Sequence, residues 1–238
     1  MKSIAILILT IANVLLFSAG AIATPISISI VQGDINAVSR DINESNIDSS
    51  EDASGTALTI ALLFNKSEIA KLLIERGANV NLPNPAGQAP LHLAVQTNNI
   101  GMVKLLLDKG ANVDGLDKLG SSALTNSAGL PFVDISISRM LIEKGANVNL
   151  VNSPGLTPLV LACLRGKILL ARLLIDKGAD INFETKEGIT PLSAAAKDNV
   201  ELINLLIAKA ADATHRNKAG RSIPEQRSVI EQMQKPRQ

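Results

Sequence analysis

Histidine and cysteine, which often serve as acid, base or nucleophile in enzymes, are few in this sequence and far apart. The 238 residues include two histidines, His92 and His215, and a single cysteine, Cys163. Cys163 has no second cysteine with which to form a disulfide or a metal site, so we expect a packed, inert thiol. The sequence also lacks a phosphate-binding Gly-rich loop, a helical His pair for zinc and a serine elbow. We therefore predict no enzyme activity, cofactor, metal or small-molecule substrate.

Acidic residues are plentiful, but their positions favour charge compensation over catalysis. An acid directly precedes a base at four related places: Glu75-Arg76, Asp108-Lys109, Glu143-Lys144 and Asp176-Lys177. Each pair comes near the end of an expected helix, where a base interacts favourably with the helix dipole. We interpret these pairs as solvated charges. The formal net charge of +1 predicts no general attraction to nucleic acid or to anionic lipid.

A repeated block of residues organises the chain. Gly-Ala-Asn or Gly-Ala-Asp begins at Gly77, Gly110, Gly145 and Gly178, and a decayed copy begins at Ala210, at intervals of 33, 35, 33 and 32 residues. A second marker repeats at 33, 33, 35 and 33 residues: Leu58, Leu91, Leu124, Leu159 and Leu192. Two markers that share a period indicate true internal repeats.

Each repeat carries signals for two helices. Thr-Pro, as in Thr157-Pro158 and Thr190-Pro191, opens a helix because the Thr hydroxyl can cap it and Pro has no amide that would be left unpaired. The Gly of the repeated block can adopt the left-handed conformation that ends the second helix. Apolar residues at helical spacing between these signals form a stripe that one repeat cannot bury alone, so neighbouring repeats must stack.

These motifs resemble the ankyrin repeat. The likeness is carried by Thr157-Pro158-Leu159, Thr190-Pro191-Leu192, Ala89-Pro90-Leu91-His92 and the Leu-rich second helices that end in Gly. The resemblance implies an all-α solenoid of stacked helix-turn-helix units joined by hairpin-like loops. Full repeats are expected at 51–83, 84–116, 117–151, 152–184 and 185–216. The resemblance also implies a hydrogen bond from His92 to nearby loop backbone, whereas His215, in the last loop, is expected to be exposed.

The third repeat is two residues longer between Leu124 and Gly145. Gly129 and Pro131 break helices and the β-branched Val133, Ile135 and Ile137 disfavour them, so we expect a lengthened inter-helix loop within 126–136. A tolerated surface insertion is the favoured interpretation. A bulge that contacts a partner is the alternative.

The flanking segments have their own patterns. Residues 24–50 align as a degenerate N-terminal capping repeat, although Ile26-Ser27-Ile28-Ser29-Ile30 alternates as a strand would. Residues 217–238 read as a polar C-terminal cap. Residues 1–23 have the layout of a secretory signal peptide, with Lys2, an apolar run and a final Ala-Ile-Ala. Cleavage is expected after Ala23, and an uncleaved membrane anchor is the alternative because 4–23 has no charge.

Binding is the remaining function class, and the family resemblance suggests the surface. We expect an exported bacterial protein, periplasmic or secreted, that binds a protein partner through its concave face and loop tips. Contact with a membrane is expected only if residues 1–23 are retained. The candidate binding residues are Leu63, Phe64, Arg76, Gln96, Lys109, Leu130, Leu156, Leu164, Arg165, Phe183, Ile189 and Lys197. A broken exposed stripe along the concave side is expected from Leu63, Phe64, Leu119, Leu130, Leu156, Leu164 and Ile189.

Two alternatives remain open for this surface. Some of the apolar residues could instead pack into the core between repeats, because sequence does not determine their exposure. A purely structural role, as a spacer or membrane-held tether, is the rival to partner binding.

Overall fold

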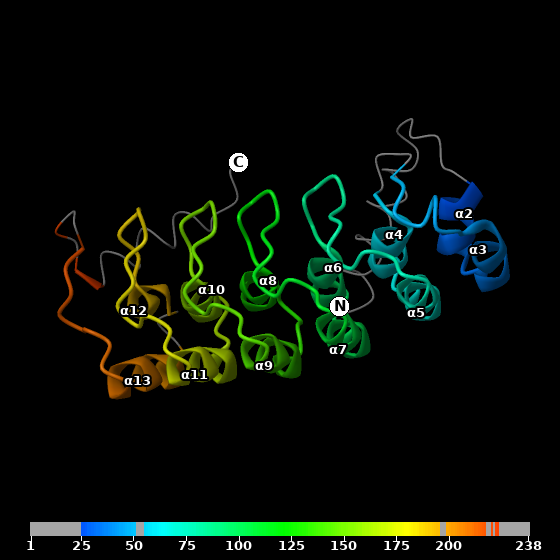
Figure 1. Ribbon diagram of the computed structural model, residues 1–238. Helices are drawn as coiled ribbons and strands as arrows, with labels where there is room; N and C mark the ends of the chain where they lie inside the picture. Colours follow the sequence, from blue (N-terminus) through cyan, green and yellow to red (C-terminus); the bar gives the residue numbers. More distant parts are fainter. Residues whose placement is uncertain (1–24, 51–54, 196–198, 218–219, 221, 224–238) are drawn as a thin grey trace.

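The computed structural model describes residues 25–50, 55–195, 199–217, 220 and 222–223, and the regular structure of these residues is helical, without strands. Helices pair into hairpins that lie side by side: α2 Pro25–Gln32 with α3 Ile35–Asp41, α4 Ala57–Leu63 with α5 Ser67–Glu75, α6 Pro90–Gln96 with α7 Ile100–Asp108, α8 Ala123–Gly129 with α9 Ile135–Glu143, α10 Pro158–Leu164 with α11 Ile168–Asp176, and α12 Pro191–Ala194 with α13 Val200–Ala208. First and second helices form two rows, and long loops project from the stack (Figure 1). The fold is the all-α ankyrin solenoid predicted from the repeats.

The helices begin where the sequence signals place them. The hydroxyls of Thr56, Ser122, Thr157 and Thr190 each accept a hydrogen bond from the backbone amide three residues ahead. Ala89 has no hydroxyl that could cap α6, so Pro90 is the start signal that remains for this helix. A side-chain oxygen satisfies one of the amides that a helix start leaves unpaired. These caps therefore determine where first helices start and where the loops end.

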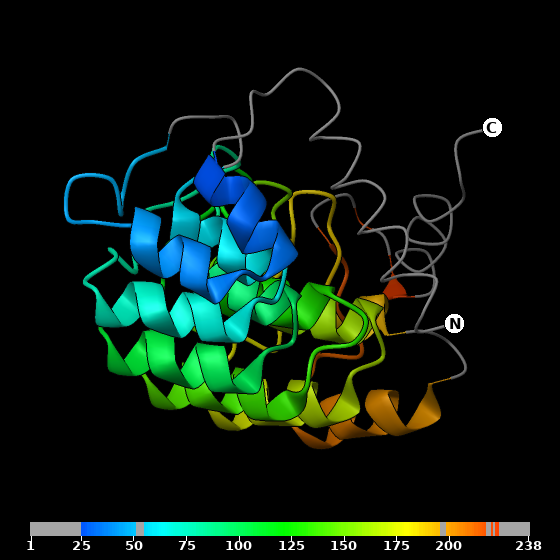
Figure 2. The same cartoon turned by 90° about the vertical axis from the view of Figure 1, so that its right-hand side faces the viewer.

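One buried cluster runs through the stack. It includes every Leu of the second marker and extends from Ile30 in α2 to Ile223. Each first helix contacts the next first helix, and second helices contact one another in the pairs α3–α5, α7–α9, α9–α11 and α11–α13. Figure 2, seen from the N-terminal end, shows the successive hairpins layered behind α2 and α3. The apolar stripe of each repeat is thus buried by its neighbours, as a solenoid requires.

Residues 25–41 form helices, so the period-two pattern does not mark a strand. Ile30 is fully buried and Ile26 packs against the core, whereas Ile28 is 44% exposed. A strand would place all three on one face, but a helix separates Ile28 from Ile26 and Ile30. Burial against α4 therefore decides the conformation.

The lengthened inter-helix loop of the third repeat is confirmed, but it is shorter than the predicted region. It spans 130–134, where the second and fourth repeats have 97–99 and 165–167. Residues 126–129 still belong to α8, and Ile135 and Ile137 belong to α9. Ile137 is fully buried, and this burial outweighs the weak helix propensity of a β-branched residue.

The predicted signal peptide and Lys197 lie outside the described residues, as do residues 224–238 of the C-terminal cap. Among the helices that the structure describes, none has the length and apolarity needed to cross a bilayer.

The decayed repeat block contains a strained residue. Ala210, two residues after the end of α13, has φ of 68°, whereas Gly110 and Gly178 occupy the equivalent places with φ of 82° and 87°. A residue with a Cβ pays about 1–2 kcal/mol in this region. Ala210→Gly is therefore expected to raise the free energy of unfolding by roughly 0.5–1 kcal/mol, after the greater unfolded-state entropy of Gly is counted.

Chemical denaturation of Ala210→Gly measures this gain. Ala211→Gly is the matched control, because Ala211 lies outside the positive-φ region and is buried. The control should lose stability. A loss in Ala210→Gly as well would contradict the strain at Ala210.

Candidate protein-binding surface

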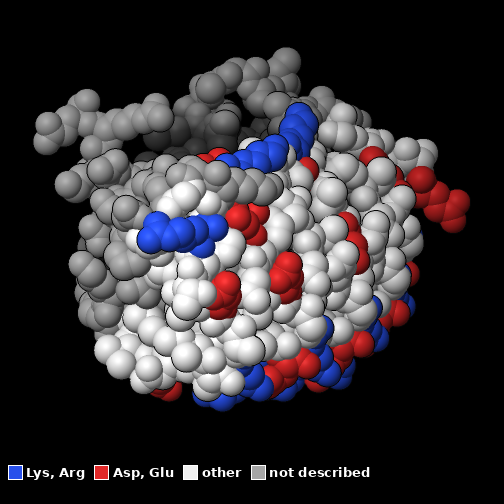
Figure 3. All heavy atoms as spheres, turned by 90° about the vertical axis from the view of Figure 1, so that its left-hand side faces the viewer, with Lys and Arg blue, Asp and Glu red and all other residues white. Residues whose placement is uncertain are grey.

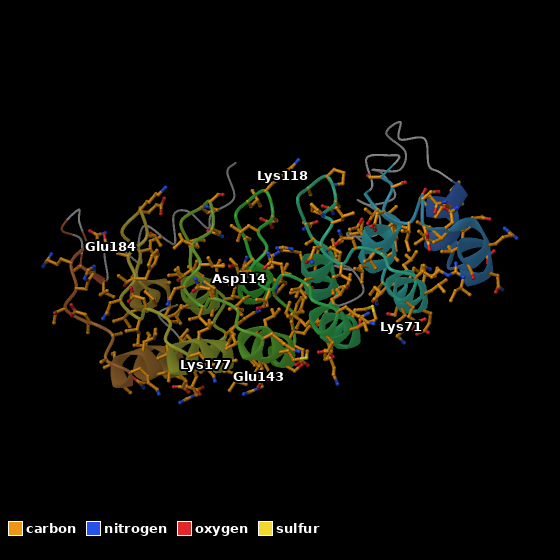
Figure 4. All side chains as sticks on the ribbon, in the orientation of Figure 1. Lys71, Asp114, Lys118, Glu143, Lys177 and Glu184 are labelled. Carbon is orange, nitrogen blue, oxygen red and sulfur yellow. The ribbon has the colours of Figure 1, made fainter. Side chains whose placement is uncertain are left out.

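The loops that project from the stack are tied together by their Asn and Asp side chains. The Oδ1 atoms of Asp48, Asn81, Asp114, Asn149 and Asn182 each accept a hydrogen bond, of 2.8–2.9 Å, from a backbone amide of the following loop. The repeated Asn and Asp residues are therefore structural. They join the bases of successive loops, whereas backbone hydrogen bonds join neighbouring tips, from the Lys118 amide to the Ala86 oxygen and from the Ser153 amide to the Leu119 oxygen. Lys118 projects from one of these tips while Asp114 lies nearer its base (Figure 4).

The two histidines are also structural. His92 is buried, and its Nε2 lies 3.0 Å from the carbonyl oxygen of Ser121 in the next loop, as the resemblance implied. His215 is not exposed as expected. Its Nε2 lies 3.2 Å from Glu184 Oε2, and both side chains are mostly covered. The partner comes from the preceding loop, 31 residues earlier, so only the stacking of repeats brings the pair together.

Cys163 is buried in α10, and desolvation raises the pKa of its thiol to about 12. Since the thiolate is the reactive form, the native protein should not react with a thiol reagent such as dithiobis-nitrobenzoate at pH 8. Full labelling is expected in denaturant. Rapid labelling of the native protein would show that the first helices open far more easily than this packing implies.

The acids and bases near the helix ends pair between repeats rather than along the chain. Lys144 Nζ lies 2.9 Å from Asp108, and Lys209 Nζ lies 2.6 Å from Asp176. Hydrogen bonds from these ammonium groups lower the pKa of both carboxyls. Charged side chains of both signs gather along the lower edge of the molecule in Figure 3, and Lys71, Glu143 and Lys177 lie on the row of second helices in Figure 4. These ion pairs are exposed, so this surface is solvated, as predicted.

Most apolar candidates for binding are packed rather than displayed. Leu63, Phe64, Leu156, Leu164 and Phe183 are half-buried against the core. Leu130 is also half-buried, and Ile189 is only 4% exposed. Leu119, on a loop tip, is the one member of the predicted stripe that is largely exposed, at 63%. The alternative, in which these side chains pack into the core between repeats, therefore describes most of the predicted broken stripe.

The polar candidates fall into three groups. Lys109 and Arg165 are exposed to solvent. The Arg76 guanidinium is exposed but donates hydrogen bonds to the backbone oxygen and hydroxyl of Ser39, which ties α5 to α3. Gln96 is half-buried, 3.5 Å from the Gln88 amide nitrogen. Loop tips and scattered polar groups, rather than an apolar stripe, make up the accessible part of the predicted surface.

The structure exposes other apolar side chains that the sequence analysis did not single out. Ile100, Phe132, Leu169 and Val200 are 42%, 64%, 69% and 59% exposed. All lie at inter-helix turns or in the first turn of a second helix. Ile100 and Val200 directly follow the N-cap residues Asn99 and Asn199, and this position was the available signal for those two. Within the described residues, no group of His, Cys, Asp and Glu is placed to hold a metal ion.

The stacked hairpins and the tied loops define a repeat scaffold, a class in which surfaces rather than cavities carry the function. A family model of ankyrin repeats in three copies matches residues 9–117, 81–152 and 132–217, so the chain belongs to the ankyrin repeat family. Ankyrin repeats are generally protein–protein interaction modules, and the fold is typically a non-catalytic scaffold.

Solved structures include close relatives of the fold. An ankyrin repeat domain from Acinetobacter baumannii AYE is 29% identical, with a TM-score of 0.73 over 79% of this chain and 98% of that chain. The human ASB11 ankyrin repeat domain is 24% identical, with a TM-score of 0.69 over 91% of this chain and 100% of that chain, and shows the fold alone. A search of the curated proteins finds no match.

Proposed function

We propose that this protein is a non-catalytic binding module that engages a protein partner through its loop tips and the adjoining ends of its first helices. The observation that supports this most is the row of loops held in place by side-chain-to-backbone hydrogen bonds between repeats. Loops that are already ordered lose little conformational entropy on binding. The exposed side chains on them, such as Lys118 and Leu119, are then available as contacts.

The absence of an exposed apolar stripe limits the kind of interface that we propose. Contacts would come from charged groups such as Lys118, with isolated apolar side chains such as Leu119. Interfaces of this composition gain association rate and specificity from charge more than affinity from burial. Binding that weakens as salt is raised is therefore part of the proposal.

Export from the cytoplasm is a further part of the proposal. It is supported by the charged start at Lys2, the apolar run to Phe17 and the small residues ending at Ala23. The rival is a tether held to the membrane by this segment, which the uncharged stretch 4–23 favours. The mass of the native protein distinguishes the two, because a chain beginning at Thr24 supports export with cleavage and a chain that keeps Met1 supports the tether.

Affinity capture with loop-tip variants tests the binding function. The full chain, tagged at its C-terminus, is compared with Lys118→Glu/Leu119→Ser on one loop tip and with Lys71→Glu/Lys104→Glu on the outer face of the second helices. The loop-tip variant should retain roughly a tenth or less of the captured partner at an unchanged melting temperature. Loss of the partner in the outer-face variant alone would contradict the proposed surface.

A further inference from the structure

The second helices place basic side chains at the same positions in successive repeats. Four of these helices, each nine residues long, have a base as their fifth residue: Lys71, Lys104, Arg139 and Arg172. The C-cap residue of each second helix from α5 to α13 is also a base: Arg76, Lys109, Lys144, Lys177 and Lys209. All of these residues are exposed, and charged side chains line the lower edge of the molecule in Figure 3.

Helix stability explains the C-cap bases but not the bases at the fifth position. The helix dipole favours a cation in the last turn, and this effect falls off within that turn. Lys144 and Lys209 also pair with Asp108 and Asp176 of the preceding second helix. The fifth residue lies in the middle of the helix, where the dipole gives it no such advantage. These bases therefore have no explanation in the stability of their own helices.

Three of the fifth-position bases have no ion-pair partner in the part of the chain that the structure describes. Lys71 lies 2.8 Å from Glu68, but the salt bridges within 4.0 Å do not include Lys104, Arg139 or Arg172. The helices that carry these three bases contact one another in order, α7 with α9 and α9 with α11. Unpaired cations on adjoining helices repel one another, so this arrangement favours an anionic ligand.

The charge on this face exceeds that of the chain as a whole. Each of α7, α9 and α11, with its C-cap residue, carries two bases and one acid. The three helices therefore have a surplus of three positive charges, whereas the formal net charge of the chain is +1. The positive charge is thus concentrated on the outer face of these three repeats.

A groove between α7 and α9 lies within this face. Its volume is about 210 Å³, and its lining residues are Lys104, Leu107, Asp108, Met140, Glu143 and Lys144. Leu107 is 8% exposed and Met140 packs against the core, so the floor of the groove is apolar and its rim is charged. A cavity of about 150 Å³ can hold benzene, so this groove has room for one large apolar side chain. The flexible Met140 side chain can adapt to its shape.

We propose that the outer face of α7, α9 and α11 binds an acidic segment of a partner protein, and that one apolar side chain of this segment occupies the α7–α9 groove. Carboxylates of the segment pair with Lys104, Arg139 and Arg172, and a guanidinium can bind a carboxylate through two parallel hydrogen bonds. Recognition of acidic motifs by clusters of Arg is an established mode of protein binding. This face is separate from the loop tips, so the proposal does not rest on the proposed function.

The composition of this face favours an acidic protein segment over nucleic acid. Proteins hold single-stranded nucleic acid largely by stacking its bases on aromatic side chains, and α7, α9 and α11 contain no aromatic residue. Asp108 and Glu143 on the groove rim repel a continuous phosphate backbone. A protein segment can place its carboxylates opposite the bases alone, and it can supply the apolar side chain that the floor of the groove fits.

Fluorescence anisotropy at low ionic strength tests the proposal with a designed acidic peptide. The probe is a labelled peptide of twelve residues, with Glu and Gly throughout and one Leu at its centre. The full chain should bind it, and Arg139→Gln/Arg172→Gln should raise the dissociation constant at least about fivefold. Lys118→Gln/Lys186→Gln is the matched control, because it removes two exposed positive charges from the projecting loops, and its affinity should equal that of the unaltered chain.

A second peptide, with Ser in place of the central Leu, tests the groove. The unaltered chain should bind the Ser peptide at least about fivefold more weakly than the Leu peptide, because only the Leu side chain gains from leaving water. Met140→Ser, with an unchanged circular dichroism spectrum, should bind the two peptides with equal affinity.

Four outcomes would overturn the proposal. No binding of the Leu peptide is the first, and equal losses in the two Gln variants, which would indicate attraction by general charge, are the second. The third is equal affinity of the unaltered chain for the Leu and Ser peptides. The fourth is tighter binding of a single-stranded oligonucleotide that is lost in Arg139→Gln/Arg172→Gln, which would assign the face to nucleic acid. None of these results requires the partner captured through the loop tips, so failure here leaves the proposed function to its own test.

Discussion

Leu124→Ala in α8 is expected to lower the free energy of unfolding by about 3–4 kcal/mol, the largest loss that a single truncation should cause. Leu124 is fully buried in the central repeat, and α8 contacts both α6 and α10. Removing its side chain leaves a cavity at two inter-repeat interfaces together. In a solenoid, stability depends on such nearest-neighbour interfaces, so a weak centre also reduces the coupling between the two halves.

Urea unfolding followed by circular dichroism at 222 nm measures this effect. Leu119→Ala is the matched control, because Leu119 lies five residues away in sequence and is 63% exposed. The control should stay within about 0.5 kcal/mol of the unaltered protein. Equal, small losses in both variants would mean that the repeats do not share one core.

Gly87→Ala is expected to cost about 2–4 kcal/mol, because it combines an unfavourable backbone conformation with a steric clash. Gly87 has φ of 78°, and a Cβ there would lie 2.8 Å from the backbone nitrogen of Lys118 in the next loop. The nitrogen belongs to backbone and cannot rotate away. The substitution should therefore separate two neighbouring loop tips.

Gly110→Ala provides the comparison, since Gly110 has φ of 82° but no atom within 4 Å of its Cβ position. Gly110→Ala therefore introduces an unfavourable backbone conformation but no clash, so we expect it to lower the free energy of unfolding by about 1–2 kcal/mol. Thermal unfolding of both variants gives the difference between them. If Gly110→Ala were as harmful as Gly87→Ala, close stacking of the loops would not explain the role of Gly87.

The helical repeats could be predicted because their signals are local. Thr157 and Pro158 open α10 through groups within one turn of the chain, and marker spacing alone located the two extra residues of the third repeat. The marker Leu residues are buried because the repeat places each in the same environment. These features depend on a residue and its near neighbours in sequence.

Exposure and long-range pairing could not be predicted in the same way. The repeat pattern alone does not show whether Leu164 is exposed or covered. In the structure Leu164 is half-buried, because neighbouring repeats cover it. His215 likewise pairs with Glu184, and Lys167 donates hydrogen bonds to the carbonyl oxygens of Ser127 and Leu130. The partners in these contacts lie about 30–40 positions apart in the sequence. Each requires the register of one loop or turn against the next, which only the stacked structure provides.

The distribution of exposed groups separates two kinds of surface on one scaffold. The loop tips present charges and isolated apolar side chains, such as Lys118 and Leu119. The row of second helices presents charged side chains of both signs, including the pairs Lys144–Asp108 and Lys209–Asp176.

Hydrogen–deuterium exchange of the full chain, alone and with its captured partner, tests most directly the claim that this solenoid acts through its loop-side surface. Slower exchange on binding is expected in the loop segments 83–88 and 117–121, with the amides of α7, α9 and α11 unchanged. Protection confined to the outer face of those second helices, with the loops unaffected, would contradict it.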